Sequence, residues 1–215
     1  MIFFFVASLL AVVIFFRKRI WELFKSLGDK GAKKDHFYIA MVVLSTFVTG
    51  GMVVFTKPLV HYLRANPIFL TGSFLFTACI LIVAQILLKK ASQKKDVGVK
   101  DSIFIGVFQG LAVLPGISRS GSTIAAGLMR KIPAQKTVEY SFMLSIPAIL
   151  GALVLELAKG GVGSIDISIA AAGFVSSFIA SVISLKFLVI LIKKTVLYPF
   201  AIYLFILAFI LPFLF

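Results

Sequence analysis

Arg119 lies near the middle of a long apolar segment, Leu111 to Met129, with glycines and hydroxyl side chains around it. An arginine at bilayer depth costs about 3 kcal/mol on insertion scales, so an arginine in such a segment is a functional candidate. Its guanidinium group can bond two oxygens of one phosphate at once. The chemistry to expect from Arg119 is therefore the binding of a phosphate.

The residues before Arg119 predict how that anion is held. Pro115 and Gly116 end a first half-helix, because proline lacks an amide donor and glycine allows a turn. Ser118 fits the N-cap position of a second half-helix that runs from about Arg119 to Met129. The unpaired N–H groups and partial positive charge at such a helix start attract anions.

Further polar side chains are candidates for the same pocket. Thr123 lies one turn after Arg119 on the same helix face, with serines alongside, and Gln109 on the preceding half-helix can donate or accept across the pocket. The candidate substrate-binding residues are Gln109, Gly116, Gly121 and Ser122. A structural reading stays open, in which the small residues serve helix packing and Arg119 locks onto backbone carbonyls.

The composition indicates an integral membrane protein. The 215 residues are 60% hydrophobic and include 23 phenylalanines, which suits a polytopic membrane protein better than a soluble domain. The net charge of +14 lies beside the apolar runs, where it fits an anionic lipid leaflet, and no nucleic-acid-binding module is visible. One cysteine, Cys79, cannot form an internal disulfide, and His36 and His61 have no partner at zinc-ligand spacing.

Six apolar runs come close to membrane-spanning length. The first is short of the roughly 20 residues that a span needs, and the basic Arg17–Arg19 after it reverses the order of a secretory signal. We predict an all-α integral membrane fold with about six transmembrane helices and one domain over residues 1–215. The runs are 1–16, 37–56, 68–88, 137–157, 165–185 and 196–214.

Charge asymmetry predicts that segment 102–131 is re-entrant. If it dips into the membrane and returns, one face carries 18 lysines and arginines and the other only Lys57, Arg64 and Lys159; if it crosses, the split falls to 13 and 8. The positive-inside bias favours the first arrangement, with both termini outside. Because non-helical backbone at this depth must be buried in protein or line a wet cavity, the chain should enclose a polar pocket.

The stretch PGISRSGST, residues 115–123, resembles the second signature of the undecaprenyl-diphosphate phosphatase family, also called bacitracin-resistance proteins. Three flanking stretches agree, so the resemblance covers nearly the whole chain. They read FQGLAVLPGISRSGSTIAAGL, YSFMLSIPAILGALVLEL and YPFAIYLFILAFIL.

This resemblance implies an enzyme of the cell (cytoplasmic) membrane that removes one phosphate from a polyprenyl diphosphate and so recycles the lipid carrier for cell-wall synthesis. It implies an inverted-repeat bundle with two re-entrant helix pairs and a site open to the outer face. By motif position the catalytic residues would be Arg119, Ser118, Ser120 and Thr123, with Gln109 in a binding role. A divalent cation, Mg or Ca, is also implied, and a homodimer is a further expectation.

The family's first signature, E-x-x-x-E followed by a serine-rich turn and a histidine, would lie upstream of where this sequence starts, so the cation's ligands are expected outside it. Glu139 and Glu156 fall near the ends of one span; the other acidic residues fall in connecting stretches, namely Glu22, Asp29, Asp35, Asp96, Asp101 and Asp166. Three explanations stay open: a truncated sequence, a first half supplied by another chain, or a homologue that binds or moves a polyprenyl phosphate without cleaving it.

Overall fold

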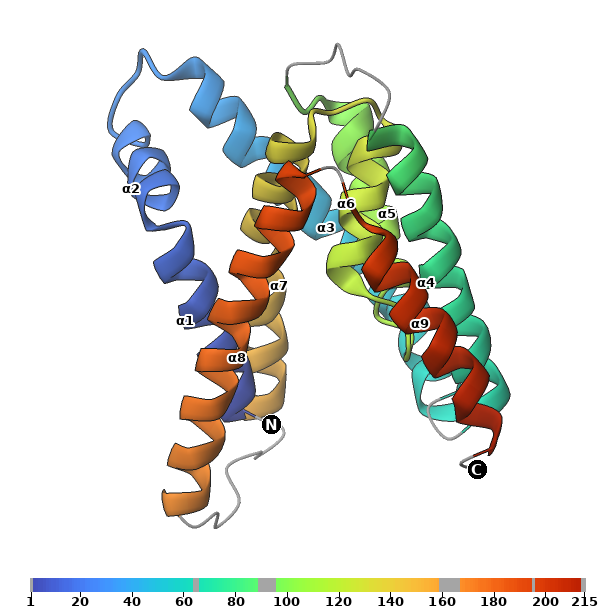
Figure 1. Ribbon diagram of the computed structural model, residues 1–215. Helices are drawn as coiled ribbons and strands as arrows, with labels where there is room; N and C mark the ends of the chain where they lie inside the picture. Colours follow the sequence, from blue (N-terminus) through green and yellow to red (C-terminus); the bar gives the residue numbers. More distant parts are fainter. Residues whose placement is uncertain (1, 64–65, 89–95, 159–166, 195, 214–215) are drawn as a thin grey trace. The chain divides into compact units, whose positions relative to one another are not determined.

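The computed structural model describes residues 2–63, 66–88, 96–158, 167–194 and 196–213, and the regular structure in them is helical (Figure 1). The helices are α1 (Ile2–Phe15), α2 (Arg17–Ser26), α3 (Lys33–Leu63), α4 (Pro67–Leu88), α5 (Val99–Leu111), α6 (Arg119–Met129), α7 (Ala134–Ala158), α8 (Ile167–Lys193) and α9 (Tyr198–Ile210), followed by a short 3-10 turn, Leu211–Phe213. The predicted all-α membrane fold is confirmed.

All six predicted apolar runs are helices. Four of them, α3, α4, α7 and α8, are long and apolar enough to cross a membrane, whereas α1 and α9 are apolar but shorter, at 14 and 13 residues. The ends of three predicted runs, at residues 1, 165–166 and 214, lie outside the described residues, as do Arg64 and Lys159.

Two helices continue past the predicted end of their run. The run expected to stop at residue 56 continues as α3 through Pro58, because one missing amide donor is tolerated in a long apolar helix. The run expected to stop at residue 185 continues as α8 through Lys186 to Lys193. In these two helices, neither the proline nor the lysine within the apolar sequence ends the helix.

Three acidic residues lie in helices, where the sequence had predicted connecting stretches. Glu22, Asp35 and Asp101 were expected in connecting stretches, but they lie within α2, α3 and α5. Helix α2 was not predicted from the sequence. It is short and polar on average, so a search for long apolar runs does not find it, although its apolar residues Ile20, Leu23 and Phe24 recur at helical spacing.

The described chain divides into two compact units. Unit 1 comprises residues 1–39 and 142–190, and unit 2 comprises residues 40–141 and 191–215. In unit 1, α1 contacts α8 through Ser8 and Ser181, whose hydroxyls are 3.3 Å apart. The prediction of one domain over residues 1–215 stays a prediction.

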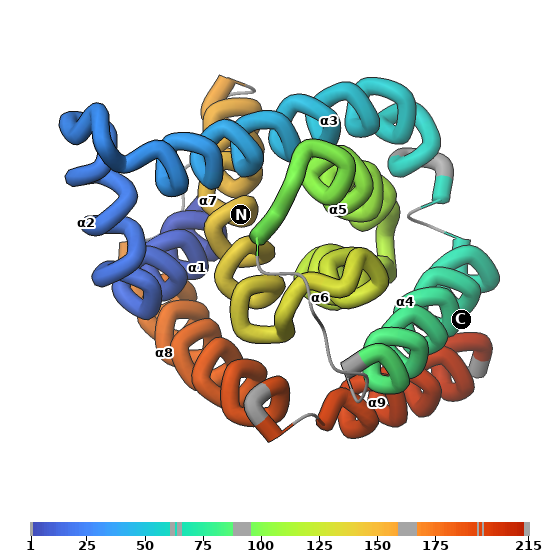
Figure 2. Tube along the Cα trace, turned by 90° about the horizontal axis from the view of Figure 1, so that it is seen from above, coloured from blue at the N-terminus to red at the C-terminus, as the bar shows by residue number. Residues whose placement is uncertain are grey.

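Unit 2 contains the predicted re-entrant segment. Figure 2 shows α5 and α6 side by side, with α3 beside α5 and α4 beside α6. Close approach depends on small residues: a Cβ on Gly106 would lie 2.8 Å from the carbonyl oxygen of Ser45, and one on Gly127 would lie 2.4 Å from Cγ2 of Thr137. Helices α3 and α7 thus pack directly against the two short helices that carry the candidate site.

Candidate phosphate-binding site

The turn between α5 and α6 confirms the predicted break in this segment. Helix α5 ends at Leu111 and α6 begins at Arg119, and in between the amide of Ile117 donates to the carbonyl of Leu114 at 3.2 Å. Gly116 has φ +85°, the left-handed conformation that glycine adopts most readily. Two half-helices joined by a tight turn are the local geometry that a re-entrant segment requires.

Gly116 is also held closely by α4. A Cβ at this position would lie 2.8 Å from Cβ of Ser73 and 3.3 Å from the carbonyl oxygen of Leu70. The turn therefore needs glycine both for its backbone conformation and for the contact with α4.

We expect Gly116→Ala to lower the free energy of unfolding by about 1–3 kcal/mol, because alanine is strained at positive φ and its methyl group has no room. The control is Gly72→Ala in α4, where a Cβ meets nothing within 4 Å and helix propensity favours alanine. Thermal unfolding of the two purified variants in detergent measures the difference. Equal melting temperatures would contradict the assignment of strain to this turn.

The start of α6 is capped as predicted. Ser118 is extended, with ψ 119°, and its Oγ accepts from the amide of Gly121 at 3.2 Å. Its own amide donates to Oγ1 of Thr77 at 3.2 Å, which ties the helix start to α4. Because Ser118 accepts from the amide of Gly121, the helix start is fixed in place. The amide of Ser120 lies in the first turn of α6, where a backbone N–H has no acceptor within the helix.

Thr123 lies differently from the other candidates. It is buried, and its hydroxyl hydrogen-bonds to the carbonyl of Arg119 at 2.9 Å and to Oγ of Ser141 at 2.6 Å. These contacts direct the side chain between α6 and α7. The geometry therefore supports a positioning role for Thr123 more directly than contact with a ligand.

Two buried polar atoms on α5 and α6 have no hydrogen-bond partner within the described structure: Oε1 of Gln109 and Oγ of Ser122. Gln109 is 2% exposed, and its Nε2 donates to Oγ1 of Thr49 on α3 at 3.3 Å. Buried polar atoms are nearly always hydrogen-bonded, so these two mark places where a polar ligand or water would be stabilised. Both residues were predicted to bind substrate.

A hydroxyl network that the sequence did not reveal lies beside the helix pair. The buried hydroxyl of Tyr140 lies 2.7 Å from Oγ of Ser45, donates to the carbonyl of Met41 at 2.7 Å, and lies 3.2 Å from Oγ of Ser102. It joins α7, α3 and α5. Tyrosine and serine in apolar runs give no pattern that predicts such a contact, because the three residues are distant in sequence.

The described residues at this site do not fit a divalent cation on their own. Hard cations take carboxylate oxygens, and no group of three His, Cys, Asp or Glu comes together in the described part of the chain. Glu139 is half-buried in α7 within unit 2, and Glu156 belongs to unit 1. The site consists of a guanidinium group, hydroxyls and amides, which is a set of donors for an anion.

The chain is similar over most of its length to proteins named undecaprenyl-diphosphatase. The chain is 39% identical to the undecaprenyl-diphosphatase of Treponema denticola over 213 residues, covering 93% of this chain and 76% of the relative. It is 34% identical to undecaprenyl-diphosphatase 2 of Halalkalibacterium halodurans, covering 96% and 78% of the two chains. It is 35% identical to the undecaprenyl-diphosphatase of Methanobrevibacter smithii, covering 94% and 78%.

The family model described as bacitracin resistance protein BacA matches residues 1–210, which include the turn between α5 and α6 and the start of α6. With the match extending over nearly the whole chain, the protein belongs to the bacitracin resistance protein BacA family.

Proposed function

We propose that this protein hydrolyses undecaprenyl diphosphate to the monophosphate and phosphate, and so recycles the lipid carrier for cell-wall synthesis. The observation that carries the proposal is the capped start of α6, where Arg119 and Ser120 occupy the first turn after a break inside the helix pair. The names of the relatives give the substrate class. The site would lie in the cytoplasmic membrane and open to its outer face.

In this proposal the start of α6 binds the terminal phosphate. Arg119 bonds two of its oxygens, and the amide and hydroxyl of Ser120 donate to others, so that charge is stabilised as the phosphoanhydride bond breaks. Water supplies the oxygen that the released phosphate gains. Ser118 accepts from Gly121 and keeps its own O–H to donate to the phosphate, and Thr123 holds the first turn through Ser141.

The charge distribution supports an orientation for the chain. Placing the basic connecting stretches in the cytoplasm puts both termini outside and brings the turn between α5 and α6 toward the outer face. A divalent cation would add charge neutralisation, with ligands other than the residues described around α6. A homodimer is a further part of the proposal, on which no step of the chemistry depends.

The competing candidate is a protein that binds or moves a polyprenyl phosphate without cleaving it. The described site favours it in one respect, since a set of donors suffices for binding.

Purified protein should release phosphate from a long-chain polyprenyl diphosphate, with binding of the same lipid measured in parallel. Ser176→Ala, which removes an exposed hydroxyl in α8, should release phosphate at the unmodified rate. Retained binding without release would favour the competing candidate.

A further inference from the structure

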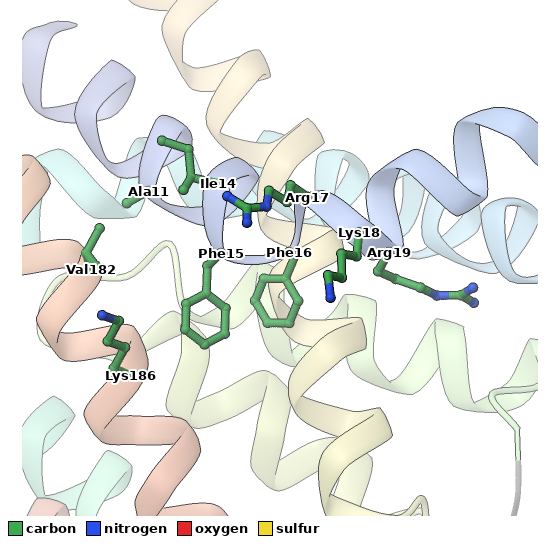
Figure 3. Close-up of a pocket in the computed structure, with 9 residues that line it drawn as sticks. All are labelled: Ala11, Ile14, Phe15, Phe16, Arg17, Lys18, Arg19, Val182 and Lys186. Carbon is green, nitrogen blue, oxygen red and sulfur yellow. The ribbon is translucent and has the colours of Figure 1, made fainter.

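A second feature of the protein, separate from the start of α6, is a cavity of about 550 Å³ within unit 1. It lies where α1 meets α2 and beside the second half of α8, from which Val182 and Lys186 come (Figure 3). Its wall combines apolar side chains with cations. The lining residues are Ala11, Ile14, Phe15, Phe16, Arg17, Lys18, Arg19, Val182 and Lys186.

Lys186 is the residue that calls for an explanation. It lies inside the candidate membrane span Ile167–Ile192, six residues before its end, which is about 9 Å along the helix axis. A charged side chain within a span is costly and in general faces a wet cavity or a partner of opposite charge. Lys186 lines the cavity, so the cavity is where that partner belongs.

The protein supplies no such partner from its own described residues. Arg17, Lys18 and Lys186 form no ion pair in the part of the chain that the structure describes, whereas Arg19 bonds Glu22 at 3.3 Å and Asp35 at 3.0 Å. Figure 3 shows Arg19 extending away from the other labelled cations. Three like charges around one cavity repel one another, so an anion among them is stabilised.

The apolar part of the wall favours a lipid over a small inorganic ion. The rings of Phe15 and Phe16 meet edge to face with centroids 4.9 Å apart, and Phe16 stacks on Phe142 at 5.6 Å. Ile14 and Val182 extend this surface along α1 and α8. Cations beside a fixed apolar surface fit a molecule with an anionic headgroup and an acyl chain.

Helix α2 places the cavity at the depth of lipid headgroups. Trp21 and Phe24 stack on each other and are 59% and 65% exposed, and Nζ of Lys25 lies 5.5 Å from the centroid of the Trp21 ring. Exposed aromatic and basic residues on one short helix are typical of a helix in the membrane interface. Because the cavity includes the first residues of α2, it opens at that level.

We propose that this cavity binds the phosphate headgroup of an anionic membrane phospholipid. Arg17, Lys18 and Lys186 contact the phosphate, and Phe15 and Ile14 contact the upper acyl chain. The site is distinct from the start of α6, which belongs to unit 2. Its occupant is a lipid that stays bound and is not turned over.

Native mass spectrometry tests the proposal. The full chain is mixed in detergent with phosphatidylglycerol or phosphatidylcholine, and the lipid that stays bound after the detergent is removed is measured. The unmodified protein should retain phosphatidylglycerol in preference to phosphatidylcholine. Arg17→Gln combined with Lys186→Met should weaken phosphatidylglycerol retention roughly 10- to 30-fold, as expected for two lost cations. Lys30→Gln removes one cation between α2 and α3, which matches the single variant Lys186→Met in charge, and it should leave retention unchanged.

Three results would overturn the proposal. Unchanged retention in the double variant would mean that Lys186 only extends toward the interface. Displacement of the lipid by millimolar inorganic phosphate would assign the cavity to a free anion, and displacement by polyprenyl diphosphate would assign it to the substrate.

If the double variant does not fold, Lys186→Met alone carries the same test, with a loss of roughly 5-fold in phosphatidylglycerol retention expected because one cation is removed.

Discussion

Arg119→Lys should lower kcat/KM for phosphate release on the order of 100-fold, although it keeps the positive charge. Lysine is a point donor and cannot bond two phosphate oxygens in the fixed geometry of a guanidinium group. Losing one preorganised donor at a site of developing charge typically costs about 100- to 1000-fold in rate. Phosphate release from polyprenyl diphosphate at subsaturating substrate measures kcat/KM directly.

The control for this exchange is Arg19→Lys in unit 1, where the arginine pairs with Glu22 and Asp35 and lies outside the candidate site. That variant should keep the unmodified activity. Thermal unfolding of both variants separates the functional reading from the structural one. If Arg119 were only a lock onto neighbouring groups, Arg119→Lys would lower the melting temperature while leaving affinity for the phosphate unchanged.

The features that could be predicted from the sequence have local causes. The start of α6 follows from Pro115, Gly116 and Ser118, since a proline, a turn glycine and an N-cap residue each act within a few residues of the chain. The apolar runs predict helices for the same reason: length and hydrophobicity suffice to define a span. The first turn of α6, where the candidate site lies, could therefore be predicted from the sequence alone.

The features that could not be predicted depend on contacts between distant residues. Thr123 bonds Ser141, and Gln109 bonds Thr49 across 60 positions of the chain. Hydroxyls and amides in apolar helices have no spacing rule that names their partners, because the packing of neighbouring helices selects them. That Thr123 handles the phosphate stays a prediction, and the sequence could not show that its hydroxyl bonds Ser141.

Acidic residues show the same limit. Sequence spacing placed Asp101 in a connecting stretch, whereas it lies in the first turn of α5 with its side chain 1% exposed. Its partner Arg130 follows the last residue of α6. Only the antiparallel return of the helix pair brings these two residues together.

Asp101→Ala should lower the free energy of unfolding by about 3 kcal/mol. The carboxylate accepts from Nε of Arg130 at 2.8 Å and from the amide of Gly98 at 2.9 Å, so its removal breaks an ion pair and a helix cap together. Arg130 is 38% exposed and can regain water, which places the loss at the lower end of the range for buried pairs. Thermal or denaturant unfolding in detergent measures it.

The exposed pair of Asp96 and Lys136 provides the control, because its 2.8 Å contact has side chains that are 72% and 49% exposed. Asp96→Ala should cost less than about 1 kcal/mol, since exposed ion pairs contribute little. Asp101→Asn should fall between the two, because the amide keeps an acceptor for Gly98 or Arg130 but loses the charge. Equal losses for Asp96→Ala and Asp101→Ala would show that the pair of Asp101 and Arg130 does not hold the base of α5 and α6 together.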